Sequence, residues 1–451
     1  MLNPPAKGIF IRDYYCSFLS KAYYYWPPQD LIALSGVLSE HYEITVIDAI
    51  GHKMNFKKAY EQILNYDFEA VIFSTGTATL ENDVGFIREL KKVKEFKAIA
   101  SSAIFTFAST ELMNKFNAID AALIDFASPG VLDYLKGDFK NIMGMIYRNN
   151  RGLFKTHSNP HRNLRFPLPR HELFIYHKYT FPLCRSPFAV VVTSVGCPFK
   201  CKFCLAGQIH FRIRELSNVL EDIRYIRELG TYDIFFADPT FTADKNYSVE
   251  LCKKMANLRI RWVCNAHTSS LMDVEFVALM KRAGCHAVMI GVESGNESIL
   301  RRYLKGVNLR EIRTAFEICK KNDIKTLAYF IIGLRGENKD SVLRTINFAK
   351  QLDCDFVSFD FATPDFGTEL REELIRDNLI PSNLLCGWDP SYKPIYSTGD
   401  LSIRNLIELR NRAYREFYLR PSYVRKRLLN LRSFYEFRDL VRGGISLFQK
   451  N

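Results

Sequence analysis

Residues 191–207 have the sequence VVTSVGCPFKCKFCLAG, and this stretch decides what kind of fold surrounds it. Its apolar start is typical of a buried strand, and Gly196 and Pro198 predict a turn directly after that strand. Three cysteines stand in this turn with C-x3-C-x2-C spacing: Cys197, Cys201 and Cys204. Soft thiolates on one short loop suit an iron–sulfur cluster. A structural zinc ion usually takes a fourth ligand, and none stands at zinc-like spacing.

The chain on both sides of this loop alternates strands and helices. Strand patterns fall at 188–194, 233–237, 260–265, 287–292, 326–332 and 355–361. A helical pattern separates each strand from the next, for example at 273–283 and 310–322. These six βα units predict an open, partial (βα)6 barrel, because the closed barrel needs more units.

A second α/β alternation precedes the first in the chain and covers residues 43–125. Strand patterns at 43–49, 70–75, 97–101 and 121–125 alternate with helical patterns at 56–64, 80–93 and 110–116. This order predicts a Rossmann-like, doubly wound parallel sheet. Such sheets bind ligands beyond the carboxyl ends of their strands, where Asp48 and residues 74–77 are expected.

The predicted organisation is therefore α/β throughout, with a helical extension at the end. We expect a Rossmann-like domain at 1–147, a linker at 148–184, the partial barrel at 185–385 and a basic helical extension at 386–451. The linker is rich in Asn, Pro, Arg and His. Its histidines have no ligand-like spacing and are expected to be solvated: His157, His161, His171 and His177.

Composition narrows the class of protein. The chain has 451 residues, 47% of them hydrophobic and 25% charged, which is typical of a folded globular protein. No apolar run is long enough for a spanning helix, and the start lacks the pattern of a signal peptide, so we expect a cytoplasmic protein. In that compartment the other cysteines are expected to be small buried side chains rather than disulfides: Cys16, Cys184, Cys252, Cys264, Cys285, Cys319, Cys354 and Cys386.

The net charge of +13 is concentrated near the end of the chain. Residues 401–451 contain 12 Lys and Arg against 4 Asp and Glu, and two basic helical patterns cover 403–419 and 423–441. We favour a helical cap on the barrel with a solvated basic face. Contact with an anionic membrane surface, an acidic substrate or nucleic acid stays open.

The cysteine loop and four later motifs resemble the radical S-adenosylmethionine (SAM) superfamily. The later motifs are FFADPTFT (235–242), WVCNAH (262–267), IGVESGNESIL (290–300) and YFIIGLRGE (329–337). The resemblance implies that Cys197, Cys201 and Cys204 hold a [4Fe–4S] cluster whose open iron chelates SAM. It also implies SAM contacts from Phe203, Asp238, Glu293, Ser294 and Gly333. His267 stands where relatives carry Arg, and is either a partner for a carboxylate or a structural histidine.

An α/β domain placed before such a core resembles the cobalamin-binding branch of that superfamily. Shared features include NPP at residues 3–5 and the strand that ends in Ser74 and Thr75. The resemblance implies cobalamin near Ser74 and Thr75, bound without a histidine ligand because the D-x-H-x-x-G motif is missing after Asp48. A domain that binds no cofactor is the alternative.

The resemblance implies a radical SAM enzyme, and we expect cobalamin-dependent C-methylation of a small lipid, tetrapyrrole or natural-product intermediate. A reducing partner such as flavodoxin or ferredoxin would supply electrons. The main alternative is an oxidative cyclase, hydroxylase or rearrangement enzyme with auxiliary or no cobalamin. An RNA-modifying enzyme is less favoured because the tail contains no recognisable RNA module, and an iron–sulfur carrier because a carrier needs no nucleoside pocket.

Overall fold

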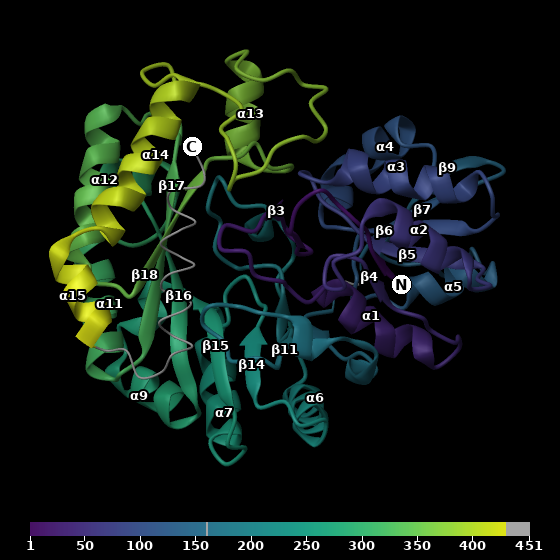
Figure 1. The fold of residues 1–451 in the computed structure, drawn as a ribbon, viewed down its shortest axis with the longest axis horizontal. Helices are drawn as coiled ribbons and strands as arrows, with labels where there is room; N and C mark the ends of the chain where they lie inside the picture. Colours follow the sequence, from purple (N-terminus) through teal and green to yellow (C-terminus); the bar gives the residue numbers. More distant parts are fainter. Residues whose placement is uncertain (159–160, 430–451) are drawn as a thin grey trace.

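The computed structural model describes residues 1–158 and 161–429. Two α/β units lie side by side: the N-terminal sheet with its helices, and the larger barrel unit (Figure 1). A hairpin of β2 (Phe10–Arg12) and β3 (Ser17–Leu19) lies between them. The α/β class predicted from the sequence is confirmed for both units.

The N-terminal sheet has the order β4-β1-β5-β6-β7-β8-β9, parallel from β4 to β7 and antiparallel thereafter. Its strands are β1 (Leu2–Asn3), β4 (Ile47–Asp48), β5 (Ala70–Ser74), β6 (Lys97–Ser101), β7 (Ala121–Leu123), β8 (Met145–Asn149) and β9 (Gly152–Lys155). Its helices are α1 (Gln29–Ser39), α2 (Phe56–Leu64), α3 (Leu80–Lys91), α4 (Ile104–Lys115) and α5 (Gly130–Lys136). The sheet reaches Lys155, past the boundary expected at residue 147.

The hairpin covers the carboxyl edge of this sheet. The N–H of Ala103, just after β6, donates to the carbonyl of Tyr14 at 2.8 Å, and the Tyr14 hydroxyl donates to the carbonyl of Ile124 at 2.6 Å. Beyond β5, the N–H of Ala78 donates to the Ser17 hydroxyl at 2.9 Å. A ligand at this edge would therefore meet the hairpin before it met the strand ends.

The second unit confirms the six-stranded open barrel, with all strands parallel in the order β11-β14-β15-β16-β17-β18. The strands are β11 (Phe188–Val191), β14 (Asp233–Phe236), β15 (Arg261–Ala266), β16 (Cys285–Glu293), β17 (Lys325–Ile332) and β18 (Phe356–Phe361). The helices are α6 (Leu216–Glu228), α7 (Lys245–Met255), α8 (Thr268–Leu271), α9 (Val274–Arg282), α10 (Glu297–Arg302), α11 (Leu309–Lys321), α12 (Lys339–Gln351) and α13 (Glu369–Arg376). A small sheet of β10 (Asn163–Leu164), β13 (Arg212–Arg214) and β12 (Ser194–Val195) lies beside it.

Burial alternates along the last two strands and distinguishes their two faces. On β18, Phe359 is buried and packs edge-on against Tyr414, whereas Asp360 is half-buried and points to the opposite face. On that face Lys21, which follows the hairpin, forms an ion pair with Asp360 at 2.5 Å. Tyr329 of β17 is half-buried in the same way. The face turned toward the hairpin is therefore partly open to solvent.

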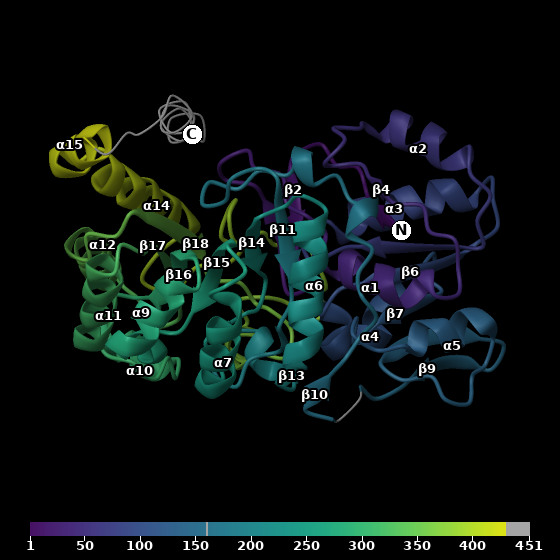
Figure 2. The ribbon, with the colours of Figure 1, turned by 90° about the horizontal axis from the view of Figure 1, so that it is seen from below.

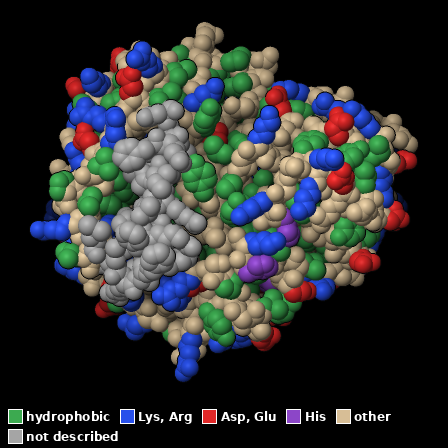
Figure 3. Space-filling model, viewed as in Figure 1, with side chains coloured by type: hydrophobic (Ala, Val, Ile, Leu, Met, Phe, Trp, Pro, Cys, Tyr) green, Lys and Arg blue, Asp and Glu red, His purple; other side chains and the backbone are tan. Residues whose placement is uncertain are grey.

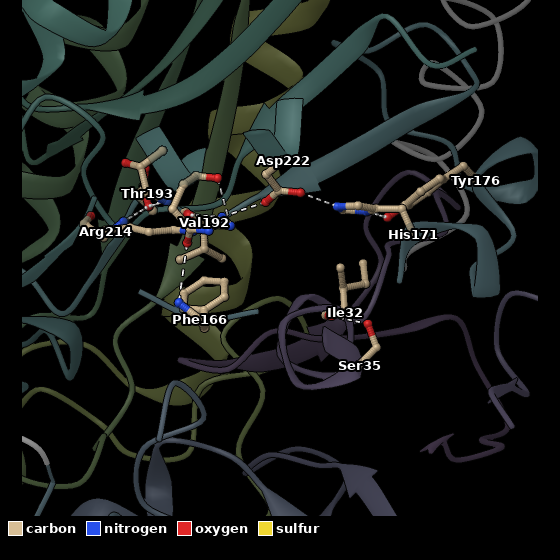
Figure 4. Close-up of polar contacts among 12 residues, drawn as sticks. Ile32, Ser35, Phe166, His171, Tyr176, Val192, Thr193, Arg214 and Asp222 are labelled. Carbon is tan, nitrogen blue, oxygen red and sulfur yellow. Dashed lines mark hydrogen bonds and ion pairs between the residues drawn. The ribbon is translucent and has the colours of Figure 1, made fainter. Parts of the chain in front are cut away.

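The linker is anchored by a buried chain of polar groups (Figure 4). Arg214 pairs with Asp222 at 2.6 Å, and the other carboxylate oxygen of Asp222 lies 2.6 Å from Nε2 of His171. His171 is 1% exposed, and its Nδ1 contacts the Tyr176 hydroxyl. The prediction of a solvated histidine is wrong for His171, because Asp222 offers a buried partner. The linker's other histidines are exposed: His157, His161 and His177.

The helical extension packs on the barrel, as the cap prediction expected. Helix α14 (Ile403–Tyr418) lies against α12 and β18, followed by α15 (Pro421–Leu429), at the end of the barrel away from the N-terminal unit (Figure 2). The rest of the predicted helix 423–441 lies outside the described residues. On the face in Figure 3, Lys and Arg side chains are spread over both units. No helix among the described residues is long and apolar enough to cross a membrane.

Seven of the dispersed cysteines are buried, as predicted: Cys184, Cys252, Cys264, Cys285, Cys319, Cys354 and Cys386. The prediction is wrong for Cys16, which is exposed at the turn of the β2–β3 hairpin. Its position follows from the hairpin's place between the two units.

Candidate functional site

The cysteine loop lies just beyond the carboxyl end of β11 and turns at Gly196. Gly196 has a φ of +72°, and a Cβ there would lie 2.7 Å from the carbonyl oxygens of Ile209 and His210. Only glycine avoids both the backbone strain and the clash. Cys197 and Cys201 are buried and Cys204 is half-buried, so the turn directs the three thiols into the protein.

Three separate segments hold the loop in place. The Gly196 N–H donates to the Tyr15 hydroxyl of the hairpin at 2.9 Å. The Cys197 Sγ lies 3.6 Å from the Thr240 hydroxyl beyond β14. The Cys201 thiol donates to the carbonyl of Leu304, after α10, at 3.9 Å. The loop is thus fixed by both α/β units.

Burial makes two of these thiols harder to ionise. Burial, together with the charge of Cys201, raises the pKa of Cys204 to about 12. Burial also raises the pKa of Cys201, and the ammonium of Lys305 opposes that rise. Among the described residues no three His, Cys, Asp or Glu side chains are grouped to hold a single metal ion. Three thiols on one short loop are the soft donors that an iron–sulfur cluster takes.

Asp238 follows β14 and is fully buried. One carboxylate oxygen accepts from the N–H groups of Thr193 and Ser194, each at 2.7 Å, and the other accepts from the Thr193 hydroxyl at 2.7 Å. Burial raises the pKa of Asp238 to about 6. The observed partners of its carboxylate all lie on the segment that leads into the cysteine loop.

Glu293 ends β16 with a left-handed φ of +67° and is 8% exposed. Its Oε1 accepts a hydrogen bond from Nζ of Lys305 at 2.8 Å. A Cβ on Gly291 would lie 2.3 Å from this oxygen and 2.8 Å from Lys305 Nζ. The ion pair therefore occupies the space that a side chain at position 291 would need. Burial alone would lower the pKa of Lys305, but the charges of Glu293 and Cys201 raise it. The pair is ionic and enclosed.

The remaining predicted SAM contacts lie on the same side of the barrel but differ in availability. Ser294 is fully buried, with its hydroxyl 3.2 Å from that of Thr345 on α12. Phe203 is half-buried, 6.0 Å from the Tyr303 ring. Gly333 has a φ of +95°, and its N–H donates to Glu337 at 2.8 Å. Phe203 leaves surface for a ligand, whereas the Ser294 hydroxyl and both backbone polar groups of the buried Gly333 are already partnered.

His267 has the surroundings of a structural histidine. It stacks on Phe199 of the cysteine loop at 3.8 Å, and its Nδ1 lies 2.8 Å from the Ser269 hydroxyl. Its Nε2 lies 3.4 Å from the carbonyl of Lys305. Burial and the charge of Lys305 lower its pKa to about 4, so it is neutral near pH 7. These contacts favour the structural alternative.

The predicted cobalamin contacts are buried in internal networks. The Ser74 hydroxyl donates to Asp30 at 2.8 Å, and the Thr75 hydroxyl donates to Asp83 at 2.8 Å. Asp83 also pairs with Arg12, with both side chains 0% exposed. Asp48 accepts from Asn3, Gly51 and Tyr179. These side chains stabilise the domain, so a corrin here would rely on the backbone and the hairpin.

Sequence reasoning did not find several residues that form the site. Lys305 lies 12 residues after its partner Glu293, and Tyr15 lies 181 residues before Gly196. No motif spacing connects such pairs. Two weak signals were available: a lysine beside Gly306 in a short loop after a helix, and polar residues in the otherwise aromatic hairpin segment.

The fold and the cysteine loop together define a class. Residues 191–349 match the family model described as the radical SAM superfamily, so the chain contains a radical SAM domain. It is therefore a radical SAM enzyme, for which the family implies a [4Fe–4S] cluster and SAM.

Three comparisons are more specific. Over 444 residues the chain is 28% identical to an uncharacterised methyltransferase of Pyrococcus horikoshii, covering 94% of each. It is 22% identical to the anaerobic magnesium-protoporphyrin IX monomethyl ester cyclase of Rubrivivax gelatinosus, covering 82% of this chain and 70% of the relative. The solved structure of TsrM from Kitasatospora setae, a radical SAM methyltransferase with cobalamin and a [4Fe–4S] cluster bound, superposes with a TM-score of 0.65. That match has 17% identity and covers 78% and 75% of the two chains, so it supports the fold alone.

Proposed function

We propose that this protein is a cobalamin-dependent radical SAM methyltransferase that acts on carbon in a small organic substrate. The observation that carries the proposal is the cysteine loop held between a barrel and a Rossmann-like unit, clamped from the N-terminal side by Tyr15. The near full-length likeness to a methyltransferase supports methyl transfer, and the shared fold of TsrM supports cobalamin.

In this proposal Cys197, Cys201 and Cys204 hold the cluster. Bound cluster and SAM supply a 5′-deoxyadenosyl radical, and methylcobalamin supplies the methyl group. The protein's own residues position and enclose these groups. Asp238 fixes the backbone that leads into the loop, and Glu293 at the end of β16 and Gly333 after β17 would border the SAM site. Phe203 provides an aromatic wall for the adenine.

The substrate site is proposed for the open face of the barrel beneath the hairpin. Tyr329 and Asp360 are half-buried there, and Lys21 reaches Asp360 from the N-terminal side. A mixed aromatic and charged surface suits a substrate with both ring and polar groups, such as a tetrapyrrole or natural-product intermediate. A low-potential electron carrier would reduce the cluster.

A second candidate keeps the radical core without methyl transfer. The internal bonds of Ser74 and Thr75, and the likeness to a cyclase, favour this oxidative cyclisation or rearrangement. In that case cobalamin is auxiliary or not bound.

One reconstitution separates these candidates. The protein is loaded anaerobically with iron, sulfide and hydroxocobalamin, desalted, and assayed for corrin absorbance and for 5′-deoxyadenosine released from SAM under reductant. Retained corrin and released nucleoside are expected. Loss of corrin with continued SAM cleavage would favour the second candidate, and an intact cluster that leaves SAM uncleaved would overturn both. Cys201→Ala should abolish the cluster absorbance, whereas Cys319→Ala, at a buried cysteine outside the loop, should retain it.

A further inference from the structure

Lys305 is a buried cation that pairs with Glu293 at the end of β16. It is 7% exposed, and its Nζ lies 2.8 Å from Glu293 Oε1. Removing a lysine and a glutamate from water costs several kcal/mol per ion, and the ion pair often does not recover that cost. A buried pair at this position therefore calls for a reason other than stability.

The backbone around the pair is strained. Lys305 stands between Leu304, with a φ of +53°, and Gly306, with a φ of +73°. Glu293 itself has a φ of +67°. A non-glycine residue in the left-handed region costs roughly 1–2 kcal/mol, and such outliers cluster at functional sites. Glu293 and Leu304, the residue before Lys305, therefore carry backbone strain, whereas Gly306 adopts its φ freely.

The segment that carries Lys305 is built against the cysteine loop. The Lys202 N–H donates to the carbonyl of Tyr303 at 3.2 Å, and the Cys201 thiol donates to that of Leu304 at 3.9 Å. The carbonyl of Lys305 faces Nε2 of His267, whose ring stacks on Phe199 of the loop. The position of Lys305 is consequently fixed relative to the Cys201 thiol and to Phe199 and Lys202 of the loop.

Resting on the proposed cluster, we propose that Lys305 is a positioning residue whose ammonium, held by Glu293, stabilises the reduced form of the cysteine-bound cluster. Reduction adds one electron from a low-potential donor, so the site gains one negative charge. A fixed positive charge in an enclosed site favours the more negative state. Glu293 holds the ammonium in place, and its own charge moderates the effect.

The test is a potentiometric titration of the reconstituted cluster, followed by electron paramagnetic resonance, in the full chain without substrate. Lys305→Met should reduce the equilibrium constant for cluster reduction about tenfold, which for one electron is a 59 mV shift to more negative potential. Lys305→Arg keeps the charge and should restore most of the wild-type potential. Glu293→Gln should shift the potential in the positive direction.

The matched control is Lys202→Met. Lys202 lies on the cysteine loop itself, but its ammonium pairs with Glu369, whose side chain is 52% exposed, so solvent screens it. The cluster potential of the Lys202→Met variant should remain near the wild-type value. Iron and sulfide content identifies variants that lose the cluster. If Lys305→Met loses it, the cluster potentials of Lys305→Arg and Glu293→Gln still test the inference. Equal potentials in all loaded variants would overturn the inference alone. A wild-type chain that binds no cluster would overturn the proposed function and the inference with it.

Discussion

The phenol of Tyr418 closes the open edge of the barrel against Val357. Its oxygen accepts from the Val357 N–H at 3.0 Å and donates to the Val357 carbonyl at 2.9 Å. Tyr414 makes the same two bonds with Phe359, at 2.9 and 3.1 Å. Four helical residues and two strand residues each advance about 6 Å, so tyrosines one turn apart on α14 match alternate residues of β18. The helix thereby satisfies a strand edge that would otherwise be open to pairing.

Replacing Tyr418 by Phe should destabilise the protein by about 1–3 kcal/mol, because a buried N–H and a buried carbonyl lose their partner. Urea unfolding followed by circular dichroism measures the change. Tyr392→Phe is the control, since Tyr392 is 61% exposed. Equal unfolding midpoints for the two variants would show that the hydroxyl does not support the edge.

A buried ion pair joins the two units. Arg212 of β13 donates to both oxygens of Asp125, beyond β7, at 2.6 and 2.7 Å, and the side chains are 3% and 1% exposed. Asp125→Ala removes the carboxylate that pairs with the buried Arg212 and should cost about 3–5 kcal/mol. Chemical unfolding and limited proteolysis of the linker would measure the loss. Asp67→Ala, which removes a solvent-exposed carboxylate, should change neither result.

Two helical glycines should respond in opposite directions to alanine. On Gly36 of α1, a Cβ would lie 2.4 Å from the carbonyl oxygen of Pro167 in the linker, so Gly36→Ala should destabilise the protein by roughly 1–3 kcal/mol. On Gly85 of α3 a Cβ meets nothing within 4 Å, and Gly85→Ala should stabilise the protein by about 0.5–1 kcal/mol. Thermal unfolding compares the two. A stabilising Gly36→Ala would mean that the linker does not pack closely on α1.

Stability should fall as pH rises toward 8, in part because of Glu337. Burial raises the pKa of this carboxyl from 4.5 to about 7, and its Oε1 has no hydrogen-bond partner. A raised folded-state pKa gives stability that is complete below the unfolded value of 4.5 and is lost as pH rises through about 7. The loss amounts to roughly 3 kcal/mol. Guanidinium unfolding at pH 5 and pH 8 should show a smaller difference for Glu337→Gln than for the wild type; equal differences would contradict the assignment.

Much of the secondary structure was determined by the sequence alone. Helix α2 and strand β6 have the bounds that periodicity predicts, and the barrel strands are all predicted to within a few residues. The turn at Gly196 and the three thiols that follow it are local as well. Such features depend on the order of apolar, polar and turn residues within a short segment, so they are accessible without knowledge of the fold.

Tertiary structure decided how those segments use their side chains. Strand β1 has two residues, too few for a pattern, yet it lies between β4 and β5. The buried His171 hydrogen-bonds to Asp222. Ser74 donates to Asp30, and Thr75 donates to Asp83. Lys305 donates to Glu293. Each of these contacts joins residues that are distant in sequence or separated by an irregular loop. Their partners are fixed by the packing of whole elements, because a buried polar group takes whichever partner the fold brings within reach.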